Sequence, residues 1–199
     1  SLVIFKLAAH TRSISTLLIV GIAVSSFLGA FTSFAVYLIG EDSFRITAWM
    51  MGYLGGANWQ KIALLLPPLL FCMAYFYAKR HELNIILNGD EEAKSLGLNV
   101  EKSKKSLLIV SSLIIGFSVA FTGMIGFVGL IIPHTLRMAL HTASNAVLIP
   151  ASALTGGVFL VFCDVIAKNA LSPVEIPIGV VTSFFGAPFF LYLAFRKHA

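Results

Sequence analysis

Few residues in this 199-residue sequence combine types and spacings that could carry out chemistry. His134 and Arg137 lie one helical turn apart and follow Pro133. They could form part of a metal or proton site, but a helix end whose basic residues bind exposed carbonyl groups is a simpler interpretation. Asp164 is a carboxylate inside an apolar run, which makes it a functional candidate. An ion pair with Lys168, four residues later, explains it more simply.

The sequence lacks the common nucleotide-binding and hydrolytic motifs. It contains no G-x-x-x-x-G-K-[ST] loop, no H-E-x-x-H pair and no G-x-S-x-G elbow. His134 and His141 share a helix face, but no cysteine or carboxylate accompanies them. Cys72 and Cys163 both lie inside apolar runs, which argues against a disulfide framework or a zinc site. We therefore expect no catalytic residue, metal or cofactor on this chain, and any ATP chemistry must lie on another chain.

The composition is that of a chain dissolved in lipid. Hydrophobic residues make up 58% of the sequence and charged residues only 12%. A soluble domain is about half apolar and about a quarter charged. The apolar runs are long and continuous, whereas a transmembrane barrel shows alternation over ~10-residue segments. The chain begins at Ser1 without a recognisable signal peptide, which suggests a start inside a longer protein.

Six apolar stretches predict an all-α, polytopic transmembrane helical bundle within a single domain, 1–199. A spanning helix needs about 20 mostly apolar residues. The fourth stretch is too short to cross a membrane unless 123–126 belong to it or it is broken. The six stretches are 14–39, 62–78, 107–125, 127–140, 147–167 and 178–195.

Lysine and arginine predict the orientation of this bundle, because cytoplasmic loops carry an excess of both. A cytoplasmic C-terminus places eleven basic residues on the inner side and three on the outer side. The inner group is Lys6, Arg12, Lys79, Arg80, Lys94, Lys102, Lys104, Lys105, Arg137, Arg196 and Lys197, and the outer group is Arg45, Lys61 and Lys168. Both ends of the chain and the polar segment 79–106 then face the cytoplasm.

The polar segment 79–106 predicts a compact helix–turn–helix. Asn88 or Asp90 can cap a short helix, and Gly97 suits its end. A second polar stretch, 99–106, leads into the next span. The segment is either a docking surface for a partner or a solvated connector, and its capped structure favours docking.

Small residues repeat every four positions along the first stretch, which would let another helix approach closely. Such a stripe serves ordinary packing within the chain, a subunit interface or the wall of a pathway. Its members are Gly21, Ser25, Gly29 and Ser33.

The run from Gly123 to Arg137 closely resembles the signature of the FecCD permease family. The residues that carry this resemblance are Gly123, Gly126, Phe127, Val128, Gly129, Pro133, His134 and Arg137. Further similarity follows in the family's order in the loop 83–97, around Asp164 and Lys168, and in 173–190, so it covers nearly the whole chain. Lys168 departs from the family's usual arginine and loses bidentate recognition of a carboxylate.

The resemblance implies the membrane subunit of a bacterial ABC importer. Such a subunit has ten spans, of which this chain would hold roughly spans five to ten, and it lies in the cell inner membrane. Two subunits, identical or different, pair around a central pathway. Residues implied for the pathway or the subunit interface are Gly21, Ser25, Gly29, Ser33, Gly179, Thr182 and Gly186.

The same resemblance implies partners on both faces of the membrane. ATPase subunits, which bind ATP and Mg, would dock on the coupling loop 79–106. The coupling residues are Asp90, Glu91, Glu92, Ala93, Ser95, Leu96 and Gly97. A periplasmic substrate-binding protein would dock on the outer side, at Arg45, Lys61 and Lys168.

The function expected from this resemblance is the passage of a metal chelate, without chemical change, by alternating access. The cargo would be an iron–siderophore, haem or cobalamin-type compound. Three other classes remain open. An ion-driven transporter would need buried carboxylates facing a cavity near the midplane, whereas the only candidate, Asp164, lies near an end of its span. An intramembrane enzyme would have to use His134, and a purely structural subunit would bind no ATPase.

Overall fold

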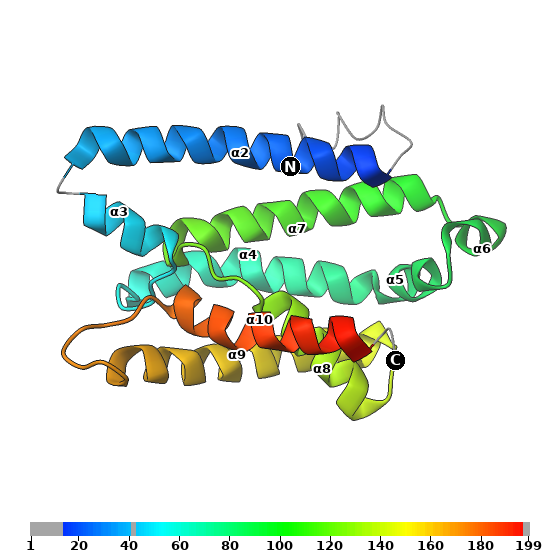
Figure 1. The fold of residues 1–199 in the computed structure, drawn as a ribbon. Coiled ribbons are helices and arrows are strands. Elements are labelled where there is room, and N and C mark those ends of the chain that lie inside the picture. The colour runs from blue at the N-terminus through cyan, green and yellow to red at the C-terminus, as the bar shows by residue number, and fades with distance from the viewer. Residues whose placement is uncertain (1–13, 41–42, 197–199) are drawn as a thin grey trace. The chain divides into compact units, whose positions relative to one another are not determined.

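The computed structural model describes residues 14–40 and 43–196, and every regular element in these ranges is a helix. Figure 1 shows them in chain order. This confirms the predicted all-α fold. The helices are α2 (Ile14–Ile39), α3 (Ser43–Met50), α4 (Trp59–Ala78), α5 (Arg80–Leu87), α6 (Asp90–Ser95), α7 (Val100–Thr122), α8 (Val128–Leu140), α9 (Asn145–Asn169) and α10 (Ile178–Arg196).

Among the described residues, four helices are long and apolar enough to cross a membrane: α2, α4, α7 and α9. Helices α8 and α10 are apolar but shorter. The fourth apolar stretch of the sequence is α8, and residues 123–127 between α7 and α8 are not helical. The expectation that this stretch is short is therefore confirmed, and residues 123–126 do not extend its helix. The non-helical segment before α8 coincides with the start of the signature run.

Contacts along the chain define two compact units, Ser1–Ala48 and Trp49–Ala199. The first unit contains α2 and most of α3, and the second contains α4 to α10. The expected site residues Gly21, Ser25, Gly29 and Ser33 all lie along α2, in the first unit.

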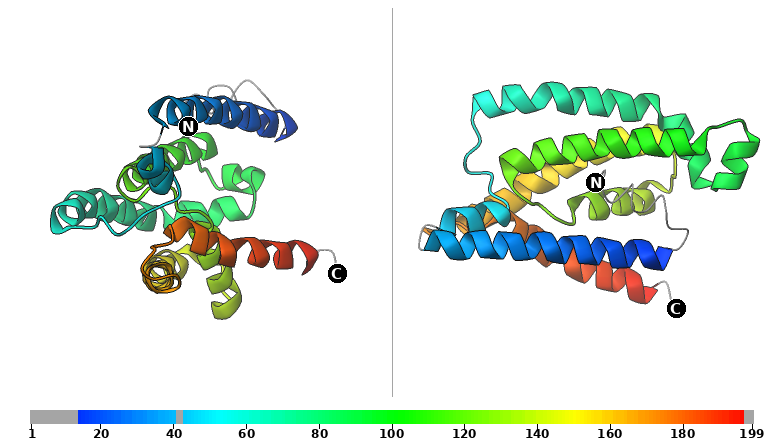
Figure 2. Two further views of the ribbon diagram at one scale, coloured as in Figure 1. Left: turned by 60° about the vertical axis from the view of Figure 1, so that its left-hand side comes forward. Right: turned by 90° about the horizontal axis from the view of Figure 1, so that it is seen from above.

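In the second unit, α9 is the central helix. It packs against α8 and α10, and also against α4 and α5, while α7 packs against α4. Figures 1 and 2 show these helices side by side, with α5 and α6 beyond one end of α4 and α7. The buried core is small and includes Cys163, Ala167, Ile178 and Val181. Most other apolar side chains point outward, which suits a chain whose surroundings are lipid or further helices.

Side-chain caps fix where two of the long helices begin. The Asn58 Oδ1 accepts a hydrogen bond from the Lys61 N–H (2.8 Å) at the start of α4. The Asn99 Oδ1 accepts one from the Lys102 N–H (3.0 Å) at the start of α7. Each bond satisfies one of the N–H groups that a helix start leaves without a partner.

The ends of α6 are formed by glycines. Gly97 has φ +81° and follows the end of the helix, and the Leu98 N–H donates to the Ala93 carbonyl (3.0 Å). This pattern is a Schellman motif and confirms the predicted stop. The predicted side-chain cap at Asn88 or Asp90 is wrong, because Gly89 occupies the N-cap position and no side chain caps the helix.

The polar segment contains one helix that sequence analysis did not anticipate. Residues 80–87 form α5, which continues almost directly from α4 and precedes the turn into α6. The stretch 99–106 is not separate from the following span, since α7 begins at Val100 and continues through it. The helix–turn–helix is therefore made by α5 and α6.

Candidate functional site

The signature run begins where three segments of the chain meet. The Tyr53 N–H donates to the Thr122 carbonyl (2.9 Å), which ties the segment after α3 to the end of α7. The Ile178 N–H donates to the Gly52 carbonyl (3.1 Å), and the Gly179 N–H donates to the Met51 carbonyl (3.0 Å). The start of α10 is thereby fixed to the same segment. Non-helical backbone at membrane depth must be satisfied by protein, and these bonds meet part of that requirement.

Glycines allow this close approach of backbones. A Cβ atom at Gly123 would lie 1.9 Å from the Trp49 carbonyl oxygen, and one at Gly179 would lie 2.2 Å from the Met51 carbonyl oxygen. Both distances are far inside van der Waals contact with atoms of the main chain. Any side chain at these positions would separate the segment 49–52 from α7 or from α10.

Phe127 connects the signature run to the last helix. It has φ +67°, a left-handed conformation that is unusual for a bulky residue and costs about 1–3 kcal/mol. Its ring covers Gly186, where a Cβ atom would lie 2.2 Å from the ring. Its ring also lies 6.0 Å from that of Phe190, measured between centroids. The Phe127 side chain therefore packs into α10, and α8 starts from a strained residue that this packing holds.

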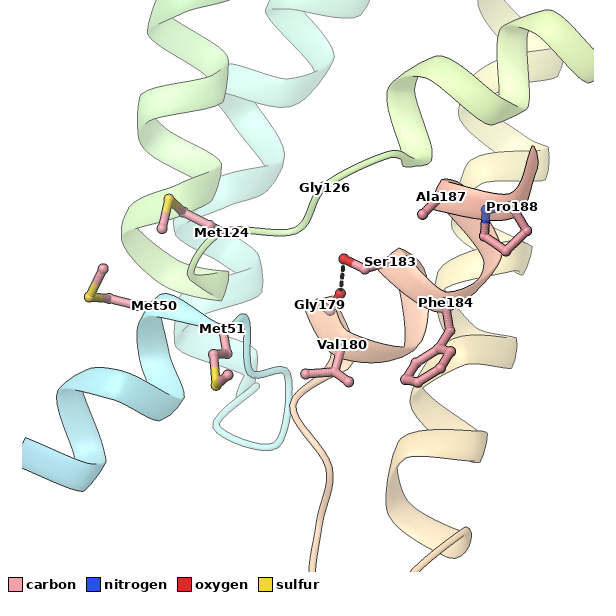
Figure 3. Close-up of a pocket in the computed structure, with 10 residues that line it drawn as sticks. All are labelled: Met50, Met51, Met124, Gly126, Gly179, Val180, Ser183, Phe184, Ala187 and Pro188. Atoms are coloured by element: carbon pink, nitrogen blue, oxygen red, sulfur yellow. Dashed lines mark hydrogen bonds between the residues drawn. The ribbon is translucent and has the colours of Figure 1, made fainter. Parts of the chain in front are cut away.

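An open hollow of about 590 Å³ lies beside this junction. Figure 3 shows methionines from two segments on one side and the first half of α10 on the other. Its lining is Met50, Met51, Met124, Gly126, Gly179, Val180, Ser183, Phe184, Ala187 and Pro188. The Ser183 hydroxyl donates to the Gly179 carbonyl (2.7 Å), so the lining presents thioether and hydrocarbon surface. It suits an apolar ligand or an apolar helix.

The remaining signature residues lie on α8. The side chains of His134 and Arg137 are exposed, and the His134 ring lies 6.0 Å from that of Phe189. Within 14–40 and 43–196, neither side chain makes a hydrogen bond or ion pair, so the expected bonds to carbonyl groups are not formed. No group of three or more potential metal ligands occurs in these ranges.

The residues expected at a pathway or interface have different surroundings. Gly179 lines the hollow, and Gly186 lies under the Phe127 ring. Thr182 is fully buried within the chain, and its hydroxyl donates to the Gly179 carbonyl (3.1 Å). The assignment of these positions and of the α2 stripe to a pathway or interface stays a prediction.

At the opposite end of α9 from its first turn, charged residues gather around the loops. The Lys168 ammonium lies 2.6 Å from the Asp164 carboxylate, which confirms the expected ion pair. Glu175, from the loop before α10, lines the same small pocket as Tyr53. Its carboxylate raises the pKa of the Tyr53 hydroxyl, because a negative acceptor beside the hydroxyl favours the protonated form over tyrosinate. Lys61 donates to the Gly56 carbonyl (2.6 Å). Sequence analysis missed the Tyr53–Glu175 contact, whose partners are 122 positions apart in the sequence.

Docking of a binding protein at this end stays a prediction. Lys168 is partly exposed beside Asp164, and Lys61 lies in the first turn of α4. The side chain of Arg45 lies outside the described residues. The docking surface proposed from the sequence would therefore include a lysine that is already paired.

The α5–α6 hairpin forms the candidate coupling site at the other end. Asp90, Glu91, Glu92, Ser95, Leu96 and Gly97 are all exposed. Leu96 is 65% exposed, whereas Ala93 is completely buried, so Ala93 anchors the helix and its neighbours face outward. The Lys104 ammonium lies 2.6 Å from the Asp90 carboxylate and ties the start of α6 to α7.

The base of the hairpin holds a charged pair outside the spans. Lys79 donates to Glu82, and the Ser103 hydroxyl donates to the same carboxylate (2.7 Å). The Lys79 ammonium and, with a smaller effect, the Ser103 hydroxyl hold the pKa of the Glu82 carboxyl below its usual value. Sequence analysis did not single out Glu82 or Ser103, because neither stands in a recognisable motif.

Comparison with known proteins places these features in one family. Residues 1–196 match the model of the FecCD transport family. The chain is 43% identical to the cobalamin import system permease protein BtuC of Halobacterium salinarum, over 92% of this chain and 49% of that protein. It is 36% identical to the hemin transport system permease protein HmuU of Yersinia pestis, over 99% of this chain and 59% of that protein.

A solved structure resembles the whole fold. It is an ABC transporter assigned to the metal-chelate type, in an inward-facing conformation. The TM-score is 0.85 at 31% identity, and the match covers 98% of this chain and 62% of that chain. The present chain spans about half the length of the curated relatives that it matches.

Proposed function

Because this chain belongs to the FecCD transport family, we propose that it forms part of the membrane permease of an ABC importer. In this proposal the permease pairs with a second permease subunit and lies in the bacterial inner membrane as a multi-pass protein. ATPase subunits bind it from the cytoplasm and a substrate-binding protein binds it from the outside. The importer moves a metal chelate of the iron–siderophore, haem or cobalamin type, and the chelate is chemically unchanged.

The α6 helix is the observation that supports this proposal most directly. It lies outside the spans and exposes three carboxylates and the apolar side chain of Leu96. Its inner face is fixed through the buried Ala93 and through the Asp90–Lys104 pair. An apolar anchor on a rigid support is the usual form of a protein-docking surface. ATP binding and hydrolysis on the partner would displace this helix and thereby move the spans.

The apolar hollow and the glycine junction provide the moving part of the proposed mechanism. Helix α10 meets the Met51 backbone without intervening side chains, so a small rotation would change the packing of a whole helix. Packed interfaces of this kind switch between discrete arrangements and do not deform continuously. Alternating access requires two such arrangements, one open to each face. Hydrolysis on the partner supplies the free energy that biases them.

Cross-linking from position 96 tests this function. Cysteine in Leu96→Cys would carry a photo-reactive group in native membranes, and Val174→Cys is the matched control because both side chains are 65% exposed. We expect position 96 to capture a polypeptide that binds a photo-reactive ATP analogue and contains a P-loop sequence, and position 174 to capture none. Failure of position 96 to capture a nucleotide-binding chain would reject the proposal.

Uptake measurements would separate the cargo classes. Membrane vesicles from cells that carry the complete importer would be supplied with ATP and with cyanocobalamin, haemin or a ferric hydroxamate. We expect ATP-dependent accumulation of one of the three. Uptake driven by an ion gradient without ATP would favour the secondary-transporter class instead.

A further inference from the structure

The first turn of α9 receives its cap from another helix. The first N–H groups of any helix lack partners within the helix, and the residue before the helix usually supplies one. Here that residue is Ser144, whose side chain makes no capping bond. The Asn84 Oδ1, on α5, accepts a hydrogen bond from the Asn145 N–H (2.9 Å) and another from the Asn145 Nδ2 (2.8 Å). The cap therefore comes from a residue 61 positions earlier.

The same helix α5 is also bonded to α7. The Glu82 carboxylate accepts a hydrogen bond from the buried Ser103 hydroxyl (2.7 Å), near the start of α7. The Lys79 ammonium neutralises this carboxylate from the other side. Charge-assisted bonds of this kind are stronger and shorter than neutral ones. Glu82 and Asn84 thus connect one short helix to the first turns of two long helices.

These bonds define a route from the candidate coupling helix to α9. Helix α6 packs against α5 and α7. Helix α5 in turn packs against α9 and caps it. Helix α5 and its Asn84 side chain are therefore sufficient to connect α6 to α9.

We propose that Asn84 is a positioning residue that joins the α5–α6 hairpin to the first turn of α9 as one rigid body. A displacement applied at Leu96 then reaches α9 without loss. This inference rests on the proposed function, because it takes α6 as the surface on which the ATPase acts. It adds a specific residue and a specific bond to that function.

Amide exchange tests the bond itself. In the complete transporter, Asn84→Ala removes the cap, and we expect faster hydrogen exchange at the first turn of α9, 145–148. The expected increase is about fivefold, equivalent to about 1 kcal/mol. Asn84→Asp retains the accepting oxygen and should restore protection. Asn88→Ala is the matched control, because Asn88 is an exposed asparagine at the end of the same helix. Unchanged exchange in Asn84→Ala would overturn the assignment of the cap.

A distance measurement tests the coupling. Spin labels at Lys94→Cys and Val147→Cys report on α6 and the first turn of α9 without replacing the Leu96 anchor, and native Cys72 and Cys163 are buried. With Asn84 present, we expect the same narrow distance distribution without nucleotide and with ATP plus vanadate. With Asn84→Ala, ATP plus vanadate should shift or broaden it, whereas Asn84→Asp and Asn88→Ala should behave like the parent.

The outcomes separate this inference from the proposed function. A distribution in Asn84→Ala that responds like the parent, or a parent distribution that changes with nucleotide, would overturn the rigid joint even if an ATPase copurifies. If no ATPase copurifies with the parent protein, the proposed function fails, and the coupling role of Asn84 fails with it. The exchange result would still show whether Asn84 caps α9. A merely structural role for Asn84 would lower the yield of folded complex and leave the distance response intact.

Discussion

Individual residues in this chain derive their importance from partners far away in the sequence. Tyr53 and Glu175 illustrate this at one end of the bundle, and Asn84 and Asn145 illustrate it at the other. None of the four belongs to a catalytic motif. Each supplies a polar contact that fixes a loop or helix end, where lipid no longer forces the backbone into a regular helix.

The Tyr53–Glu175 contact predicts a dependence on alkaline pH. The raised pKa means that the folded protein favours protonated Tyr53 more than the unfolded chain does. This contribution to stability is fully present below the ordinary tyrosine pKa of about 10 and is lost as the pH rises through the raised value. We expect Glu175→Gln to bring the Tyr53 pKa back toward its ordinary value.

Ultraviolet titration would measure this change. The tyrosinate absorbance of the parent protein minus that of Tyr53→Phe isolates this one tyrosine among the five in the chain. The same subtraction would be made in the Glu175→Gln background. An identical midpoint with and without the Glu175 carboxylate would contradict the contact.

Among the elements, the junction of the segment 49–53 with α7 and α10 depends on close backbone approach at glycines. At Gly123 and Gly186 an added methyl group would collide with the Trp49 carbonyl and the Phe127 ring, respectively. The helices therefore approach one another at backbone distance, as small residues permit in membranes.

Alanine substitutions should expose this dependence. We expect Gly123→Ala and Gly186→Ala each to destabilise the protein by about 1–3 kcal/mol, because overpacking shifts the backbone or the ring. At Gly116, within α7, nothing lies within 4 Å of an added Cβ. Gly116→Ala should therefore be neutral or slightly stabilising, since alanine favours a helix.

Thermal unfolding in detergent, followed by the loss of the monodisperse chromatographic peak, would rank the three variants. Equal midpoints for Gly116→Ala and Gly123→Ala would show that the junction tolerates a side chain. We expect Gly123→Ala to destabilise the protein more than Gly186→Ala, because Gly123 also has φ +69°, a conformation that residues with a side chain rarely adopt.

At the scale of the whole molecule, the two ends of the helical bundle differ in charge, and this difference predicts how the bundle is oriented in the membrane. One end carries α5 and α6 with Lys79, Arg80, Lys94, Lys102, Lys104 and Lys105, and the other carries the Tyr53–Glu175 contact and the Lys168–Asp164 pair. The excess of lysine and arginine predicts that the first of these ends faces the cytoplasm. The proposed ATPase and binding-protein contacts both depend on this orientation.

Labelling with a membrane-impermeant maleimide tests the orientation. In intact spheroplasts, we expect Val174→Cys to react and Leu96→Cys to remain unmodified until the membrane is permeabilised. The parent protein provides the background, since Cys72 and Cys163 are only 3% and 0% exposed. Reaction of Leu96→Cys in intact spheroplasts would show that the predicted topology is inverted. ATPase docking on α6 would then have no basis.

The sequence by itself determined the class of this molecule. Apolar runs of about 20 residues require helices in lipid, because backbone groups there must bond within their own segment. Charge placement then predicted the orientation, and local signals such as Gly97 predicted where α6 ends. The Asp164–Lys168 pair was also predictable, because its partners are neighbours on one helix.

Only the tertiary structure decided which distant segments cap or pack against one another. It placed Gly89 at the start of α6, where sequence analysis expected Asn88 or Asp90. It also brought Asn84 to the start of α9 and Gly186 beneath Phe127. A local sequence pattern shows which bonds a residue can make. It does not show which element caps a helix start or packs against a glycine, because any element that approaches can do so. Which element approaches depends on the packing of the whole bundle, and no spacing within one segment contains that information.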